Sequence, residues 1–326
     1  MVNYTRIIKN TRDLKALGHH IPTNKEDTMR KVKIITDSCS DLNTELLERY
    51  DIDYAKMTTV CKGVEAPALL TWSDEEAHEL YDVIRGGDRV KTAQVSMEEF
   101  DRIFRKYLDD GYDIVYIGCS SKQSGSVNTG YVMAQDLLDE YPDAKISCID
   151  SLNASIGEGM LAIEAAKLAA EGKGADEITE HILSVRKKVH EYVTVHTLDH
   201  LRKAGRVSGP SAFFGNILGV KPIIIADANG VQAAYKKVKG RQNSFREIVA
   251  LLKESIVAPE EQTIYVAQAD CDKAELQHLI DYIKSEITCK DICVVTIGPI
   301  IGASIGPDAV GVWGFGDEIT FAIDEK

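Results

Sequence analysis

Residues 112–126 read YDIVYIGCSSKQSGS, an apolar strand that runs into a polar loop and then into a helical pattern ending near Tyr141. The same order occurs from residue 32, where VKIIT precedes a polar loop and a short helix, and from residue 144, where AKISCID precedes an Ala-rich helix. Apolar strands separated by helices of this length are typical of βαβ units. The sequence therefore predicts a parallel sheet covered by helices on both faces.

The second half of the chain has a different pattern. In IIIADANGVQAAY, Asn229-Gly230 lies between two strand-like runs, which is a hairpin signal and predicts antiparallel pairing. Further strands are expected at TIYVAQ, DICVVTIG and ITFAI, with helices near 243–256 and 272–286 between them. We therefore expect an α+β arrangement in this half.

Gly172-Lys-Gly174 follows the Ala-rich helix and predicts a domain boundary. The expected fold class is α/β in two domains, a parallel-sheet domain over 29–172 and an α+β domain over 173–326. Residues 1–28 carry no periodic apolar pattern, so they are expected to form a loosely held extension, with Met29 as an alternative start.

Composition narrows the function classes. The 326 residues carry a net charge of −13, which matches nucleic acid poorly, and no apolar run is long enough to insert stably in a membrane. The opening sequence lacks the apolar core of a secretory signal, and the seven Cys include no CxxC pair, so we expect reduced thiols and a cytoplasmic protein. From Arg186 to Arg246, twelve Lys and Arg stand against three Asp and Glu. This basic segment is either a solvated surface or a face for a phosphate or an acidic partner.

Hydroxyl side chains follow three strands of the predicted parallel sheet. The richest of these loops contains Ser120, Ser121, Ser124 and Ser126, and the others begin at Asp37 and Asp150. Any one of them is an ordinary helix-capping loop. Because the carboxyl ends of parallel strands meet at one edge, the three together predict a rim of uncharged donors able to hold a carboxylate or a phosphate.

Nucleotide-binding motifs are missing from the sequence. It contains no GxxxxGK[ST] and no GxGxxG, and no cofactor is indicated. Asp37 follows a strand and is either a nucleophile or a capping and orienting carboxylate. An acyl- or phosphoryl-transfer enzyme using Asp37 and the rim of Ser120, Ser121 and Ser124 is therefore the alternative to a binding protein.

Seven motifs occur in an order and spacing that resemble the DegV family of bacterial fatty-acid-binding proteins. They are ITDSCSDL (35–42), KTAQVSMEEF (91–100), CSSKQSGS (119–126), CIDSLNASIGEG (148–159), TLDHLRKAGRVSG (197–209), LGVKPIIIADANG (218–230) and IGPIIGASIGPDAVG (297–311). The resemblance implies two α/β domains around one long-chain fatty acid, with its carboxyl at the domain junction and its tail buried. It further implies a carrier that presents the lipid to the catalytic subunit of a fatty acid kinase.

The resemblance also assigns residues. Thr92, in the segment matching the family's TSQPS, keeps a head-group hydroxyl, and Ser124, in the segment matching SSxxSGT, is the second carboxylate-binding hydroxyl. Arg206 matches the arginine of Gly-Gly-Arg and is expected at a docking surface or at the acyl-phosphate end of the site. Ser304 and Asp308 replace the His and the final Gly of the family's HxGPG. An Asp308 facing the site would add negative charge there and disfavour an acyl phosphate. The uncharged stretch 211–218 is expected to be either part of the tail wall or an amphipathic core helix.

Overall fold

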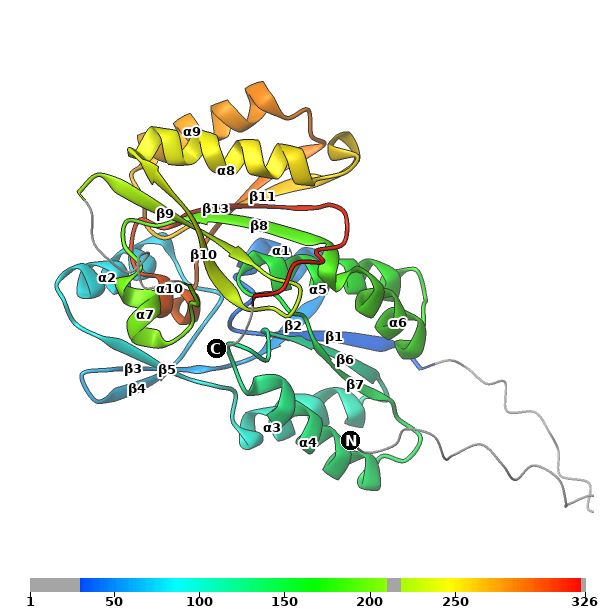
Figure 1. Ribbon diagram of the computed structural model, residues 1–326. Coiled ribbons are helices and arrows are strands. Elements are labelled where there is room, and N and C mark those ends of the chain that lie inside the picture. Colours follow the sequence, from blue (N-terminus) through cyan, green and yellow to red (C-terminus); the bar gives the residue numbers. More distant parts are fainter. Residues whose placement is uncertain (1–29, 210–217, 324–326) are drawn as a thin grey trace, which may run out of the picture.

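The computed structural model of the protein describes residues 30–209 and 218–323 (Figure 1). The expectations for residues 1–28, for Met29 and for 211–217 lie outside the described residues.

A four-stranded parallel sheet forms the first layer, as the sequence predicts. Its order is β2-β1-β6-β7, with β1 (Val32–Asp37), β2 (Ile52–Ala55), β6 (Asp113–Gly118) and β7 (Ile146–Asp150). Its helices are α1 (Thr44–Arg49), α3 (Met97–Asp109), α4 (Ser126–Glu140), α5 (Ile156–Ala170) and α6 (Ala175–Val185). Ile34 packs in the cluster that includes α5 and α6, whereas Ile35 packs in the cluster that includes α3 and α4. Burial on both faces explains why these strands lack polar alternation.

A small antiparallel sheet follows, with the order β4-β3-β5. It contains β3 (Thr58–Cys61), β4 (Val64–Pro67) and β5 (Val90–Ala93), and α2 (Asp74–Arg85) connects β4 to β5. The sequence pattern of DYAKMTTVC (53–61) predicts one strand, but these residues belong to two strands, β2 and β3, which lie in different sheets. Strand β3 pairs with β5, which carries Thr92.

The second layer is a mixed six-stranded sheet with the order β10-β9-β8-β13-β11-β12. Its strands are β8 (Val189–Thr194), β9 (Val220–Ala226), β10 (Gln232–Lys239), β11 (Thr263–Gln268), β12 (Asp291–Thr296) and β13 (Val310–Phe315). Figure 1 shows α8 (Arg241–Ser255) and α9 (Lys273–Glu286) on the face away from the four-stranded sheet. The remaining helical segments are α7 (Asp199–Ala204), α10 (Pro299–Ile305) and the single 3₁₀ turns η1 (Arg186–Lys188) and η3 (Pro259–Glu261).

The predicted hairpin joins β9 and β10, which pair antiparallel. The Asp227 carboxylate accepts hydrogen bonds from the backbone N–H groups of Asn229 and Val231, both at 2.9 Å. Gly230 adopts a φ of 78°, which favours glycine over other residues. The Asn-Gly signal thus marks a turn held by a side chain two residues before it.

Two expectations about the second half need correction. Residues 319–323 form no strand; the Phe321 carbonyl accepts one hydrogen bond from Ala228 N–H at 2.9 Å, which falls short of a ladder. Helix α6, expected in the second domain, packs on β6 and β7 together with α5. Helix α6 thus lies with the four-stranded sheet, and the six-stranded sheet begins with β8 at Val189. Among the described residues, no helix is long and apolar enough to cross a membrane.

Candidate ligand-binding site

A cavity of about 350 Å³ lies between the two layers. The first layer contributes residues at the carboxyl ends of β1 and β6, and the small sheet contributes β5. The six-stranded sheet contributes its inner face, and α10 closes one side. A ligand between two sheet units at the carboxyl ends of parallel strands is the usual arrangement in open α/β folds.

Thr92 and Ser124 both line this cavity although they are 32 positions apart in the sequence. The loops that carry them are tied together by Ser126, whose Oγ lies 2.9 Å from Ser124 Oγ and accepts a hydrogen bond from Val95 N–H at 3.2 Å. Two hydroxyls from distant segments therefore meet on one wall.

The N-terminus of α4 opens onto the same wall. Gly125 is its N-cap, lines the cavity and has no capping side chain, and within the first turn the Ser126 N–H donates to Ser124 Oγ at 3.3 Å. The first turn of this 15-residue helix contains no acidic residue. Uncapped N–H groups and the positive end of the helix dipole favour an anion at this position.

Gln123 and Arg206 add a donor and a positive charge. Gln123 Nε2 is buried and has no hydrogen-bond partner among the described residues, and Gln123 lines the cavity. Arg206 lines the cavity as well, and its Nε donates to the Gln123 carbonyl at 3.2 Å. Among the described wall residues, Arg206 is the one Lys or Arg. Sequence reasoning missed Gln123, although it belongs to the quoted SSKQSGS loop.

The structure separates the six candidate residues into two groups. Thr92, Ser124, Ser304 and Arg206 line the cavity. Ser120 and Ser121 are not among the wall residues. The fully buried Ser120 hydroxyl donates to the Gly230 carbonyl at 2.8 Å, so it braces the β9–β10 hairpin. Ser121 is exposed, and its N–H donates to the Asp150 carboxylate at 3.1 Å.

Most of the remaining wall is apolar. It includes Met57, Val193, Leu201, Ile224, Ile297 and Ile300. Such a surface can bind hydrocarbon through the hydrophobic effect but offers no group for acid–base chemistry.

Two thiols, Cys39 and Cys119, also line the cavity. Their sulfur atoms and a Glu158 carboxylate oxygen lie within 4.8 Å of one another, which is a possible soft metal site. A side-chain hydrogen bond with Cys119, followed by burial, raises the pKa of Cys39 well above its ordinary value, and burial raises that of Glu158. The two thiols therefore hold their protons near neutral pH, and a metal ion would have to displace those protons.

Asp37 is not among the wall residues. Its carboxylate accepts hydrogen bonds from Tyr116 Oη at 2.7 Å, Cys39 N–H at 2.9 Å and Cys119 N–H at 3.3 Å. Burial raises its pKa although these hydrogen bonds oppose the shift. These contacts suit a carboxylate that orients Cys39 and Cys119 in the cavity wall. They do not suit a nucleophile, because the Asp37 carboxylate does not reach the cavity.

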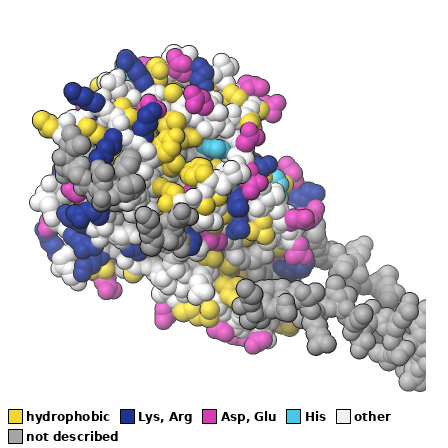
Figure 2. Space-filling view, in the orientation of Figure 1, with side chains coloured by type: hydrophobic (Ala, Val, Ile, Leu, Met, Phe, Trp, Pro, Cys, Tyr) yellow, Lys and Arg dark blue, Asp and Glu magenta, His cyan; other side chains and the backbone are white. Residues whose placement is uncertain are grey.

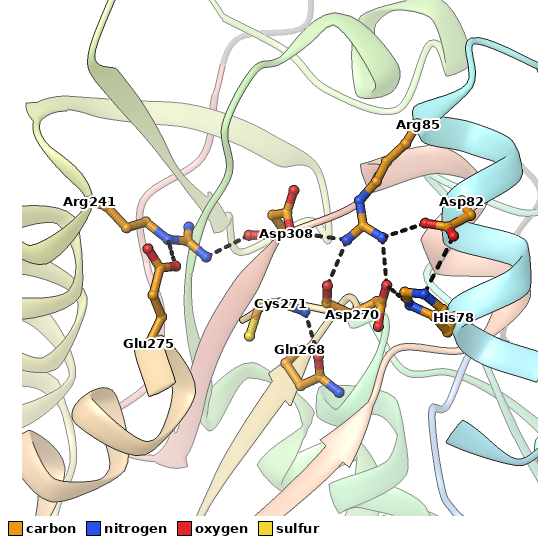
Figure 3. Close-up of polar contacts among 9 residues, drawn as sticks. All are labelled: His78, Asp82, Arg85, Arg241, Gln268, Asp270, Cys271, Glu275 and Asp308. Atoms are coloured by element: carbon orange, nitrogen blue, oxygen red, sulfur yellow. Dashed lines mark hydrogen bonds and ion pairs between the residues drawn. The ribbon is translucent and has the colours of Figure 1, made fainter. Parts of the chain in front are cut away.

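Asp308 faces away from the cavity, contrary to the arrangement that would add negative charge to the site. Figure 3 shows its carboxylate paired with Arg85 of α2, at 3.1 Å. The same guanidinium pairs with Asp270 at 2.6 Å. Because Asp308 is not among the wall residues and pairs with Arg85 instead, the expected repulsion of an acyl phosphate loses its source.

A polar cluster on the six-stranded sheet was not expected. Glu191, Gln232 and Trp313 line the cavity, and the Glu191 carboxylate accepts hydrogen bonds from Gln232 Nε2 and, at 3.0 Å, from Trp313 Nε1. Burial raises the pKa of Glu191 to about 7 despite these hydrogen bonds. The burial of Glu191 could have been predicted from the strand pattern VHEYV (189–193), in which Glu191 shares a face with two valines.

The sequence and the fold of this chain are similar to those of known proteins. The family described as "Uncharacterised protein, DegV family" matches residues 31–315. A DegV domain-containing protein of Clostridium perfringens is 33% identical over 291 residues, which are 89% of this chain and 99% of the relative. A DegV lipid-binding protein from Thermotoga maritima has a similar structure, with a TM-score of 0.78, 26% identity and coverage of 89% of this chain and 100% of that one. A DegV fatty-acid-binding protein from Bacillus subtilis shares the fold, with a TM-score of 0.75 and 23% identity over 88% of this chain and 99% of its own.

Proposed function

Because this chain belongs to the DegV family, we propose that its cavity binds one long-chain fatty acid, with the carboxylate at Thr92 and Ser124 and the acyl chain along the apolar wall. The observation that carries the proposal is the composition of the wall, where hydroxyls, a free amide donor and an arginine adjoin apolar side chains. The lipid binding named for the relative in Thermotoga maritima agrees with it.

The carboxylate requires donors because an ionised group removed from water is costly unless it is hydrogen-bonded. Thr92, Ser124 and Gln123 Nε2 supply neutral donors, and the start of α4 and Arg206 supply positive charge. An acyl chain of about sixteen carbons contributes roughly 10 kcal/mol on burial before ordering costs are subtracted. Tail burial therefore provides most of the affinity, and the donors set the orientation.

We further propose that the protein is a cytoplasmic carrier, without a cofactor, that presents its lipid to the catalytic subunit of a fatty acid kinase. Arg202, Lys203 and Arg206 are exposed on and just after α7, and Leu201 of the same helix lines the cavity. Figure 2 shows Lys and Arg side chains gathered at the left of the molecule. This placement puts positive charge beside the site, where an acidic partner or a phosphate would approach.

The first test is denaturing mass spectrometry of the lipid that copurifies with the protein. A stoichiometric long-chain fatty acid is the expected result. A delipidated protein that binds no fatty acid by calorimetry would contradict the proposal. Turnover of acyl or phosphoryl donors by the purified chain alone, abolished by Asp37→Asn, would instead establish the enzymatic alternative.

A further inference from the structure

The cluster of Glu191, Gln232 and Trp313 lies in the wall of a cavity that the rest of the chain makes largely apolar. Glu191 lies directly opposite Trp313 in the β8–β13 pairing, and Gln232 comes from the start of β10. All three are buried, with exposed fractions of 4% for Glu191, 9% for Gln232 and 1% for Trp313. A buried carboxylate in such a wall destabilises the protein, because two hydrogen bonds offset only part of the free energy lost when the group leaves water.

The cluster has unused hydrogen-bonding capacity on the cavity side. A carboxylate can accept about four hydrogen bonds, and the described contacts to Glu191 supply two. An unsubstituted hydrocarbon chain has no hydrogen-bond donor. When it binds, the remaining acceptor sites of Glu191 either have no partner or must bind an enclosed water molecule. A ligand hydroxyl would donate to Glu191 and accept from Gln232, and it would remove this cost.

Apolar side chains occupy the wall positions next to Glu191, so the fold does not require a polar residue at this place in the sheet. Val193 occupies the next inward position on β8, and Ile224 occupies the corresponding face of β9. The two side chains contact the same cavity as Glu191. The polar group is thus local, which favours recognition of one polar group on an otherwise apolar ligand.

We propose that this site selects lipids whose acyl chain carries a hydrogen-bonding group, a hydroxyl above all, over unsubstituted saturated chains. The inference rests on the proposed fatty acid binding and narrows the ligand class. The pKa of Glu191, about 7, lets the same side chain act as acceptor or donor near neutral pH.

The experiment is calorimetric titration of the delipidated full chain with hexadecanoate and with a series of monohydroxyhexadecanoates that differ in hydroxyl position. At least one hydroxy isomer is expected to bind about tenfold more tightly than hexadecanoate, as one hydrogen bond to a charged group provides. Glu191→Met combined with Gln232→Met should reduce that ratio to about one and leave hexadecanoate binding equal or stronger. Glu191→Gln, which keeps a hydrogen-bonding side chain, is the matched control and should retain a preference.

The outcomes separate this inference from the function on which it rests. Hexadecanoate binding at least as tight as that of every hydroxy isomer would overturn the inference and leave fatty acid binding standing. An unchanged ratio in the double Met variant would also overturn it, since the cluster would then serve only to hold β8, β10 and β13 together. Failure of every fatty acid to bind would overturn the proposed function itself. Should the double variant fail to fold, Glu191→Met alone removes the acceptor and should likewise lower the ratio.

Discussion

Replacing Glu191 with Gln should make the protein's stability less dependent on pH. The carboxyl is buried, and its pKa rises from the ordinary 4.5 to about 7 because burial disfavours the charged form. Below pH 4.5 the group is protonated in both the native and the unfolded state, so its ionisation does not change the free energy of unfolding. Between pH 4.5 and 7 the unfolded chain releases the proton while the native state keeps it, so the free energy of unfolding falls as pH rises.

The size of the effect follows from the two pKa values. At about 1.4 kcal/mol for each pH unit, the ionised Glu191 costs about 3 kcal/mol above pH 7. Glutamine mimics the protonated acid. Its Oε1 can accept from Trp313 Nε1, and its Nε2 can donate to Gln232 once that amide turns over.

Urea unfolding of the delipidated protein at pH 5, 6, 7 and 8 measures this directly. The free energy of unfolding of the Gln variant should increase relative to that of the natural protein as pH rises, and the difference should reach about 3 kcal/mol by pH 8. Glu254→Gln, an exposed change on α8, is the control and should leave the pH dependence unaltered. A difference between Glu191→Gln and the natural protein that stays constant from pH 5 to pH 8 would refute the reasoning.

Five further substitutions, two of them controls, test the site and the β9–β10 turn. Ser124→Ala should weaken fatty acid binding about tenfold by calorimetry, through one lost hydrogen bond to a carboxylate, while Ser121→Ala, exposed and off the cavity wall, should bind as the natural protein does. Gly230→Ala should destabilise the fold by about 2–4 kcal/mol in urea unfolding, because its φ is 78° and a Cβ would lie 2.4 Å from Ser120 Oγ and 2.9 Å from Leu152 backbone atoms. Gly63→Ala has a similar φ of 81° but open space, so it should cost only about 1 kcal/mol; an equal loss in both variants would contradict the packing argument. Arg206→Ala should lower acyl-phosphate formation with a cognate kinase and leave lipid occupancy nearly unchanged, because tail burial provides most of the affinity; loss of the lipid would contradict this and show that the Arg206 charge is needed to hold it.

The sequence by itself determined the repeating strand-and-helix order of the first layer and the β9–β10 hairpin. Both depend on local physics. Ile34 and Ile35 are adjacent and apolar because opposite faces of β1 are covered, and Asn229-Gly230 permits the backbone of a tight turn. The family motifs likewise pointed to Thr92, Ser124, Ser304 and Arg206, and all four line the cavity.

Tertiary structure alone decided which polar groups face the cavity. Ser120 and Ser124 are four positions apart in one loop, yet the first turns to the Gly230 carbonyl and the second to the cavity. Asp308 lies in a motif of the site, yet it pairs with Arg85, which lies 223 positions away. Glu191 looked like an ordinary strand residue until β13 and β10 brought Trp313 and Gln232 to it. A side chain's direction depends on partners that the fold supplies from distant segments, and local pattern carries no information about them.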